Sequence, residues 1–228
     1  MKVAVITGCT QGIGYATALR LSEAYHIVGC ARTPLSIQNV RQKHPTWDLH
    51  VCDLSDKTQV YTFAGFIRQH YPAIDVLINN AGQFMPGSFL DEPDEAYELM
   101  IKTNLSSAYY LTKALLPVLI AQRRGLIINI ASVASIVAYP TGSAYSIAKA
   151  GLLSFSRNLR EQLKPYSIGV TAMLLGATLT RSWEGSPYPP ERFIPPEAVA
   201  DLIWSFVHLP SSLVVEEIVI RPMLGDIK

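Results

Sequence analysis

The chain has 228 residues, of which 49% are hydrophobic and 16% charged, and its formal net charge is +1. This composition is typical of a folded globular protein, and the length fits one α/β domain spanning 1–228. With no basic run beyond Arg123-Arg124, the sequence gives no support to nucleic-acid binding or membrane-surface binding.

Three cysteines, Cys9, Cys30 and Cys52, supply neither an even disulfide set nor a paired metal motif. We therefore expect buried, reduced thiols and no metal site. Cys9 precedes an expected helix N-terminus, which can lower a thiol pKa, but we expect no function for this thiol. The chain begins on a strand-like run without a signal-peptide layout, and a cytoplasmic location is the expectation.

Strand-like and helix-like segments alternate along the chain. Near-continuous apolar runs such as 74–78 and 126–130 suit parallel strands that are covered on both faces. The alternation predicts a Rossmann-like, doubly wound parallel sheet of about seven strands with helices on both faces. We expect strands at 2–6, 26–31, 47–52, 74–79, 125–131, 167–175 and 213–220, and helices at 13–24, 35–43, 56–71, 92–103, 105–123, 143–164 and 196–208.

A glycine-rich turn follows the first expected strand and opens the first helix. Such glycines permit a tight turn and let backbone amides approach a pyrophosphate at the helix N-terminus. No lysine follows the last glycine, which excludes a Walker phosphate loop. The residues expected to contact a dinucleotide here are Gly8, Thr10, Gln11, Gly12, Ile13 and Gly14.

The second and third expected strands end in residues suited to an adenosine. An acidic residue after the second strand would bind the ribose 2′-hydroxyl of NAD, but Arg32 stands there and can pair with a 2′-phosphate. This favours NADP, with NAD still open, unless Arg32 is only a solvated loop charge. Asp53, followed by Leu54, could accept from the adenine amino group; alternatively, Asp53 or Ser55 caps the next helix.

Two further segments are candidates for the ligand site. Asn79-Asn80-Ala81-Gly82 ends the fourth strand, where asparagines can tie strand ends together and small residues leave room for a ribose. These residues could instead serve only to hold the sheet edge. The proline-rich segment 177–196 follows a strand and suits a loop over a ligand, or a plain surface loop.

Tyr145 and Lys149 are four residues apart, so on a helix they share one face. Lowering a phenol pKa from about 10 to about 7 takes roughly 4 kcal/mol. One ammonium about 4 Å away, at an effective dielectric of about 20, supplies approximately that amount. We therefore expect Tyr145 to be a general acid/base tuned by Lys149, with Ser132 as a second donor to a reacting oxygen.

A second pair with the same spacing, Tyr109 and Lys113, shows that the spacing alone is weak evidence. No serine after a strand precedes this pair, so we expect helix packing or a subunit contact there. Asn104, from the residues alone, is at most a cap between two helices. The apolar faces of the helices near 105–123 and 143–164 fit either the core or a subunit interface; they carry Leu111, Leu115, Leu152, Phe155 and Leu159.

Taken in chain order, these motifs resemble the short-chain dehydrogenase/reductase family in its single-domain form. The glycine turn, Asp53, the Asn79–Gly82 run, Asn104, and Ser132 placed 13 residues before Tyr145 all follow the family's order. The chain looks similar to carbonyl reductases of the sepiapterin-reductase type and to 3-oxoacyl-carrier-protein reductases.

The resemblance implies a catalytic tetrad, in which Tyr145 protonates a carbonyl oxygen while hydride leaves a nicotinamide. Ser132 would hold that oxygen, Lys149 would also bind the nicotinamide ribose, and Asn104 would support a water chain. The nicotinamide side would include Gly176, Thr178 and Thr180. Two departures are Leu175 in place of the family's usual proline and Gln11 in place of the basic residue common in NADP-preferring members.

The expected function is therefore an NADP-preferring reductase interconverting a small-molecule carbonyl and an alcohol. The resemblance also implies a homodimer or homotetramer through the two long helices. The alternatives are a catalytically silent nucleotide-binding regulator of the same fold and a methyltransferase on a similar sheet. The residues expected to line the substrate side are Phe84, Ser132, Ala134, Tyr139, Tyr145, Ala177, Trp183 and Tyr188.

Overall fold

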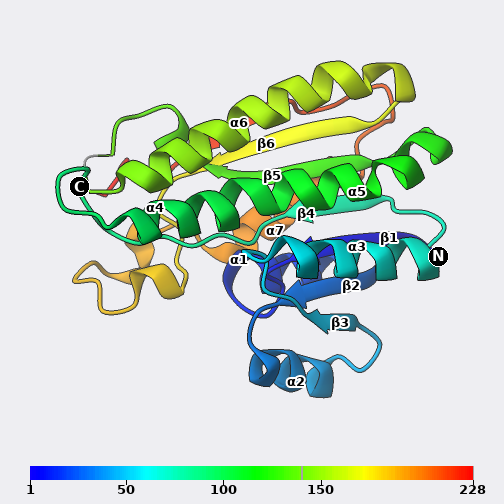
Figure 1. Ribbon diagram of the computed structural model, residues 1–228, viewed down its shortest axis with the longest axis horizontal. Coiled ribbons are helices and arrows are strands. Elements are labelled where there is room, and N and C mark those ends of the chain that lie inside the picture. The colour runs from blue at the N-terminus through cyan, green and yellow to red at the C-terminus, as the bar shows by residue number, and fades with distance from the viewer. Residues whose placement is uncertain (140, 228) are drawn as a thin grey trace.

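The computed structural model describes residues 1–139 and 141–227 and places seven strands of these residues in one sheet (Figure 1). The strand order is β3-β2-β1-β4-β5-β6-β7, and every neighbouring pair is parallel. The expected doubly wound parallel sheet is confirmed. The strands are β1 (Val3–Thr7), β2 (His26–Ala31), β3 (Asp48–Val51), β4 (Val76–Asn79), β5 (Leu126–Ser132), β6 (Gly169–Leu175) and β7 (Glu217–Ile220).

Helices cover both faces of the sheet, as expected. Helices α1 (Gly12–Leu21) and α7 (Pro196–Val207) pack together on one face. Helices α3 (Lys57–His70) and α5 (Ser107–Gln122) pack together on the other (Figure 1). In the described part of the chain, no helix combines the length and the apolar character needed to cross a membrane. The helices are α1 (Gly12–Leu21), α2 (Pro34–Lys43), α3 (Lys57–His70), α4 (Asp94–Ile101), α5 (Ser107–Gln122), α6 (Ser143–Leu163) and α7 (Pro196–Val207).

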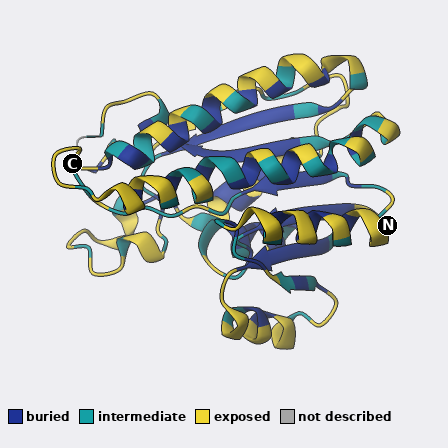
Figure 2. Cartoon of the chain, viewed as in Figure 1, coloured by how far each residue is buried: buried dark blue, intermediate teal, exposed yellow. Residues whose placement is uncertain are grey.

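Alternate side chains of each strand enter different hydrophobic cores, because successive residues of a strand point to opposite faces. In β1, Val5 packs with Phe63 and Leu115 on one face, and Ile6 packs with Ile203 on the other. Figure 2 shows the resulting pattern of buried strands beneath helices with exposed outer faces. The sequence did not decide whether four leucines of the two long helices belong to the core or to a subunit interface. In the structure all four are buried in the chain: Leu111, Leu115, Leu152 and Leu159.

A chain of buried polar side chains joins the two middle strands to two helices. The Asn79 side chain on β4 donates to Asn129 Oδ1 on β5 at 2.8 Å and to Thr112 Oγ1 on α5 at 3.0 Å. Asn129 Nδ2 then donates to Ser156 Oγ on α6 at 2.8 Å. Buried amides need such partners, so this chain fixes α5 and α6 against the sheet. The expectation that asparagines tie neighbouring strands is confirmed.

The helices expected at 92–103 and 105–123 are joined rather than separated. A π-helical turn, Lys102–Ser106, connects α4 directly to α5. Asn104 lies inside this turn and donates to Met100 O at 3.0 Å, so the reading of Asn104 as a cap between helices is wrong. A π turn accommodates an extra residue without ending the helix, which is why the helical pattern merely drifts here.

The segment 177–196 is closed at its base. Thr178 forms a bridge with Ile194, and two backbone bonds of 2.9 Å, Leu179 N to Ile194 O and Ile194 N to Ala177 O, hold the two ends together. Between these ends lie two short 3₁₀ turns, Arg181–Trp183 and Pro190–Arg192. The strand expected at 213–220 is shorter in the structure, where β7 begins only at Glu217.

Candidate active site

The candidate residues gather at the carboxyl edge of the sheet. The strand order reverses between β1 and β4, and in open α/β sheets ligands bind beside such a reversal. The arrows of β1, β4, β5 and β6 all point to the left in Figure 1, so the loops that follow these strands leave from the same edge of the sheet. The topology therefore brings the glycine turn and the Ser132 and Tyr145 region to one end of the molecule.

The glycine turn has the backbone that its sequence requires. Gly8 and Gly12 have φ of +67° and +52°, the left-handed region that favours glycine. A Cβ at Gly14 would lie 2.2 Å from Gly8 O and 2.4 Å from Asn80 Nδ2, and a Cβ at Gly12 would lie 3.1 Å from Thr180 Cγ2. The predicted residues Asn80 and Thr180 therefore do lie against the turn.

The start of α1 is open to an anion, and Thr7 fixes the loop beside it. Gln11, the residue before α1, makes no side-chain capping bond within the described residues, so the first N–H groups of the helix are available. Thr7 Oγ1 accepts from the backbone N–H groups of Asn80 at 3.0 Å and Ala81 at 2.9 Å, which fixes the neighbouring loop. This positioning role of Thr7 is not among the sequence expectations; the signal for it is a buried hydroxyl at the end of an apolar strand.

At the adenosine side, Arg32 is exposed at the end of β2. Its Nη1 lies 3.4 Å from Gln83 Oε1, a long hydrogen bond that reaches across the end of β1 from the loop after β4. The side chain makes no carboxylate ion pair among residues 1–139 and 141–227. Its positive charge is thus available beside the predicted nucleotide site.

The polar residues after β3 differ from one expectation. Asp53 Oδ1 accepts from Ser55 N at 2.9 Å and Ser55 Oγ at 2.7 Å, forming a local turn before α3. The cap of α3 is Asp56, whose side chain accepts from Thr58 N at 2.8 Å. Capping by Asp53 or Ser55 is therefore wrong, because only Asp56 directly precedes the first helical residue. Leu54 is buried beside them.

Ser132, Tyr145 and Lys149 lie together, as the sequence predicts. Ser132 ends β5, while Tyr145 and Lys149 occupy the first two turns of α6. The Ser132 hydroxyl lies near enough to Tyr145 to influence its pKa, and Lys149 Nζ lies 5.6 Å from the centroid of the Tyr145 ring. Lys149 is only 4% exposed, and its Nζ donates to Ile130 O at 2.8 Å.

The electrostatics of this group depart from the sequence expectation. Burial raises the pKa of Tyr145 to about 12, although the Ser132 hydroxyl partly offsets that rise. Burial also lowers the pKa of Lys149 to about 8. The expectation that Lys149 lowers the Tyr145 pKa is thus wrong for this structure. The cost of burying a charge has the larger effect on the pKa of both groups. At neutral pH Tyr145 carries a proton that it can donate.

Asn104 holds the loop after β4 over Lys149. Its Oδ1 accepts from Gln83 N at 3.1 Å, and its Nδ2 donates to Gln83 O at 2.9 Å. A Cβ at Gly82 would lie 2.7 Å from Asn104 Oδ1 and 3.4 Å from Lys149 Nζ, so only glycine fits between them. The structure therefore brings Ala81-Gly82 to the tetrad, while the water-chain role of Asn104 stays a prediction.

Aromatic side chains flank Tyr145. The Phe84 ring meets Tyr145 edge-on at a centroid distance of 5.2 Å and lies 5.9 Å from the Tyr139 ring. Trp183 instead packs against buried Phe193 at 5.1 Å, so part of the expected substrate lining belongs to the loop's own core. Ala134 is buried, Ala177 is half-buried and Tyr188 is exposed.

On the expected nicotinamide side, backbone geometry is set by the end of β6. Gly176 N donates to Ile220 O at 2.8 Å, and Thr178 Oγ1 donates to Gly176 O at 3.0 Å. A Cβ at Gly176 would meet Pro222 Cδ at 3.0 Å and Asp226 Oδ1 at 3.2 Å. This contact with the segment after β7 is not among the sequence expectations, because no sequence motif predicts it.

The cysteines belong to the cores. Cys9, Cys30 and Cys52 are all buried free thiols, as expected. Burial raises the pKa of Cys9 to about 12, so the nearby helix N-terminus does not lower it. Among the described residues, no group of three or more His, Cys, Asp or Glu side chains is arranged to hold a metal ion.

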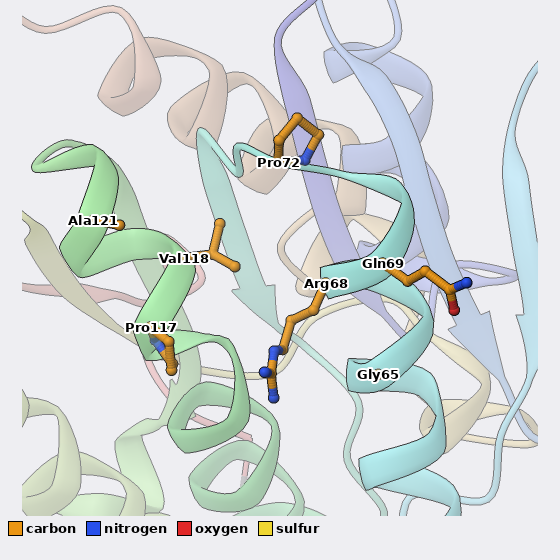
Figure 3. A pocket seen from close by; sticks show the side chains of 7 residues that line it. All are labelled: Gly65, Arg68, Gln69, Pro72, Pro117, Val118 and Ala121. Carbon is orange, nitrogen blue, oxygen red and sulfur yellow. The ribbon is translucent and has the colours of Figure 1, made fainter.

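A surface hollow of about 650 Å³ lies away from this site, between α3 and α5 (Figure 3). Its lining comes from the ends of these helices that lead into β4 and β5, at the amino edge of the sheet. Arg68 is its one charged side chain, and no acid/base pair accompanies it. It does not compete with the carboxyl-edge site. The lining residues are Gly65, Arg68, Gln69, Pro72, Pro117, Val118 and Ala121.

Comparison with known proteins agrees with this geometry. The family model for short chain dehydrogenases matches residues 2–187. A sepiapterin reductase of Chlorobaculum tepidum is 30% identical over 99% of this chain and 98% of its own. A crystallised short-chain oxidoreductase of metagenomic origin, in complex with NADP, is 28% identical, covers 98% of both chains and has a TM-score of 0.85.

An alcohol dehydrogenase from the archaeon Thermococcus sibiricus, complexed with 5-hydroxy-NADP, is similar over 100% of this chain and 99% of its own, with 26% identity and a TM-score of 0.88. The family match covers most of the chain, from the first strand to the segment after β6. It includes the glycine turn, Asn104, Ser132, Tyr145 and Lys149. The chain belongs to the short-chain dehydrogenase family of oxidoreductases.

Proposed function

We propose that this protein is an NADP-preferring reductase that interconverts a small carbonyl compound and its alcohol. The observation that carries the proposal is the meeting of Ser132, Tyr145 and Lys149 at the same sheet edge as the glycine turn. The proposal is supported by the relatives described above, two of which were crystallised with NADP or a derivative of it.

The residues present fit a dinucleotide. Gly14 and Gly82 let the glycine turn and the loop after β4 pack closely on Asn80 and Asn104, and uncapped N–H groups at the start of α1 suit a pyrophosphate. The turn residues Gly8–Gly14 would hold the pyrophosphate. Arg32, Asp53, Leu54 and Asn80–Gly82 would hold the adenosine, and Lys149, Gly176, Thr178 and Thr180 the nicotinamide side. The bound cofactor would supply the hydride.

The protein's part in the chemistry is proton transfer and positioning. A raised pKa keeps the proton on Tyr145 until a carbonyl oxygen gains negative charge, and Tyr145 then donates it. The Ser132 hydroxyl, which lies near Tyr145, holds the same oxygen. Lys149, whose pKa is about 8, can pass a proton to the resulting tyrosinate, while Asn104 keeps the neighbouring loop in place.

The substrate is proposed to be a small or medium, partly apolar ketone or aldehyde, because Phe84 and Tyr139 flank Tyr145. Cytoplasmic location and assembly as a homodimer or homotetramer through α5 and α6 are part of the proposal. Exposed Tyr109 and Ile147 on these helices support such an interface, since the leucines facing inward are already used by the core.

The direct test measures NADPH oxidation with a panel of diketones, quinones and aldehydes. Oxidation that depends on both the protein and a carbonyl supports the proposal. Tight NADPH binding without turnover on any carbonyl would instead favour a silent regulator. Protection against heat by S-adenosylmethionine and not by NADPH would favour a methyltransferase.

Cofactor preference has its own test in Arg32→Ala. Loss of a charge-assisted bond to a 2′-phosphate should weaken NADPH roughly tenfold or more, because such bonds are about twice as strong as neutral ones, and should leave NADH nearly unchanged. Dissociation constants for the two cofactors, measured by fluorescence titration, decide the matter. Arg68→Ala, an exposed arginine at the other edge of the sheet, is the matched control. If the affinities for NADPH and NADH fell equally, Arg32 would have no specific role in recognising the 2′-phosphate.

A further inference from the structure

We propose that Arg192 is a positioning residue that clamps the segment 221–227 onto the nicotinamide side of the site. This inference rests on the proposed function, because it takes Gly176 as part of that side. Arg192 lies in the 3₁₀ turn that precedes the closing strand-like contact of the 177–196 loop. It is half-buried, and it makes no ion pair in the described part of the chain.

The guanidinium of Arg192 contacts three consecutive backbone carbonyls. Nη1 donates to Gly225 O at 3.0 Å, and Nη2 lies 3.4 Å from Asp226 O and 3.5 Å from Leu224 O. A planar group with several fixed donors can serve such an array, whereas an ammonium is a single point charge. The clamp is therefore specific to arginine.

The carbonyls converge because the segment turns at Gly225. Gly225 N donates to Pro222 O at 2.8 Å, and Gly225 has a φ of +78°, in the left-handed region. Arg221 Nε adds a bond of 3.0 Å to Asp226 Oδ2. The segment thus forms a compact turn that presents its oxygens to Arg192 on one side.

The other side of the same turn packs against Gly176. Pro222 and Asp226 stand where a Cβ of Gly176 would lie within 3.0 and 3.2 Å of them. Gly176 is also bonded through its N–H to Ile220 O, immediately before the turn. A shift of the turn is therefore transmitted to Gly176, and through it to Thr178, whose hydroxyl donates to Gly176 O.

The clamp also reaches the substrate loop. Arg192 is followed by buried Phe193, on which Trp183 packs, and by Ile194, which bridges Thr178. Releasing Arg192 should loosen both the base of the loop and the turn, while leaving the glycine turn and Arg32 undisturbed. The predicted effect is therefore confined to one half of the dinucleotide site.

The test compares two ligands in Arg192→Ala. NADPH spans the whole site, whereas adenosine 2′,5′-bisphosphate occupies only the adenosine half. We expect NADPH to bind roughly tenfold more weakly, since bonds from a charged donor are lost, and the bisphosphate to bind as in the wild type. Arg192→Lys should lie between the two. Arg157→Ala, which removes an arginine that holds β7 through Glu217 but does not touch the turn, should leave both ligands unchanged.

A glycine pair gives an independent variant. Gly225 and Gly185 have nearly equal φ, +78° and +80°, and neither has a neighbour within 4 Å of an added Cβ. Gly225→Ala should weaken NADPH selectively, through backbone strain alone, and Gly185→Ala should not. Equal NADPH binding by the wild type and Arg192→Ala, or parallel loss of both ligands, would overturn this inference alone. A wild-type protein that binds no NADPH would overturn the proposed function as well.

Discussion

Two tyrosine–lysine pairs of identical spacing occur on two adjacent helices, and only one of them lies at the candidate site. In α5, Lys113 Nζ is 5.6 Å from the centroid of the Tyr109 ring; in α6, Lys149 Nζ is 5.6 Å from the Tyr145 ring. The internal geometry of the two pairs is thus the same. Residues four apart on a helix are neighbours on its surface, so this spacing alone can bring a lysine close to a tyrosine ring.

Their surroundings differ. Tyr109 is 41% exposed, Lys113 is exposed, and the Tyr109 ring packs on Phe155 of α6 at 5.6 Å, as expected for a pair that serves helix packing. Lys149 is buried and bonded to the carboxyl end of β5, and Tyr145 is buried beside Ser132. Both helices place a tyrosine beside a lysine, but only the pair in α6 lies at the carboxyl edge of the sheet, next to Ser132 and the end of β5.

The largest effect that separates the pairs is expected for Tyr145→Phe. Removal of a general acid should lower turnover about a hundredfold or more, with NADPH binding largely kept. Steady-state kinetics with the best carbonyl of the panel measure it. Tyr109→Phe removes the equivalent hydroxyl from the other pair and should change turnover less than about twofold. Similar losses in both variants would show that the position of the pair does not matter.

A smaller effect, on stability, is expected for Asn104→Ala, which removes the side chain that holds the loop after β4 over Lys149. The change leaves Gln83 N and Gln83 O, which are half-buried, without their partner and should cost about 1 to 2 kcal/mol of unfolding free energy. Urea denaturation measures it. Asn158→Ala removes an exposed amide that donates to Ser154 O on α6, and should cost about 0.5 kcal/mol or less. Equal costs would mean that Asn104 makes only a local helix bond.

An effect of similar size, seen only as a change with pH, concerns the stability of Lys149→Met. Because burial lowers the folded pKa of Lys149 to about 8 from the ordinary 10.5, the unfolded state binds more protons between these values. Wild-type stability should therefore rise with pH relative to Lys149→Met, by about 2 kcal/mol between pH 7 and pH 10. Below pH 8 the buried charge opposes folding.

Denaturant unfolding at pH 7, 8.5 and 10 provides the measurement. Lys113→Met, in the exposed pair, is the matched control. A Lys149→Met curve parallel to that of the wild type would contradict the lowered pKa. The upper limit of pH 10 matters because Tyr145, with its raised pKa, then begins to favour the unfolded state.

Elements that depend on local sequence pattern could be predicted from the sequence. The strands and most helices follow from apolar periodicity, and the glycine turn follows from the φ values that only Gly8 and Gly12 adopt easily. The capping residue of α3 was missed because Asp53, Ser55 and Asp56 are all good caps, and only the first helical residue decides among them. Asn104 was misplaced between helices because a π turn has no distinct composition.

Other features of the site depend on groups that carry no sequence mark. Lys149 donates to a backbone carbonyl, that of Ile130, and Arg192 donates to three more. Any residue could supply such an oxygen, so neither contact could be predicted. The direction of the Tyr145 pKa shift likewise follows from burial by Phe84 and its neighbours, which is a property of the folded chain.

The polar chain from Asn79 through Asn129 to Ser156 has a consequence for how the sheet can assemble. Slipping β4 by one residue against β5 would turn Asn79 to the opposite face, among the apolar side chains under α1 and α7, with no partner for its amide. The same slip would carry Gly82 off Lys149. A folding intermediate with β4 and β5 out of register would therefore be less stable than one with the correct register. These two strands carry the loop with Gly82 and the residue Ser132, so their register also sets the geometry of the proposed active site.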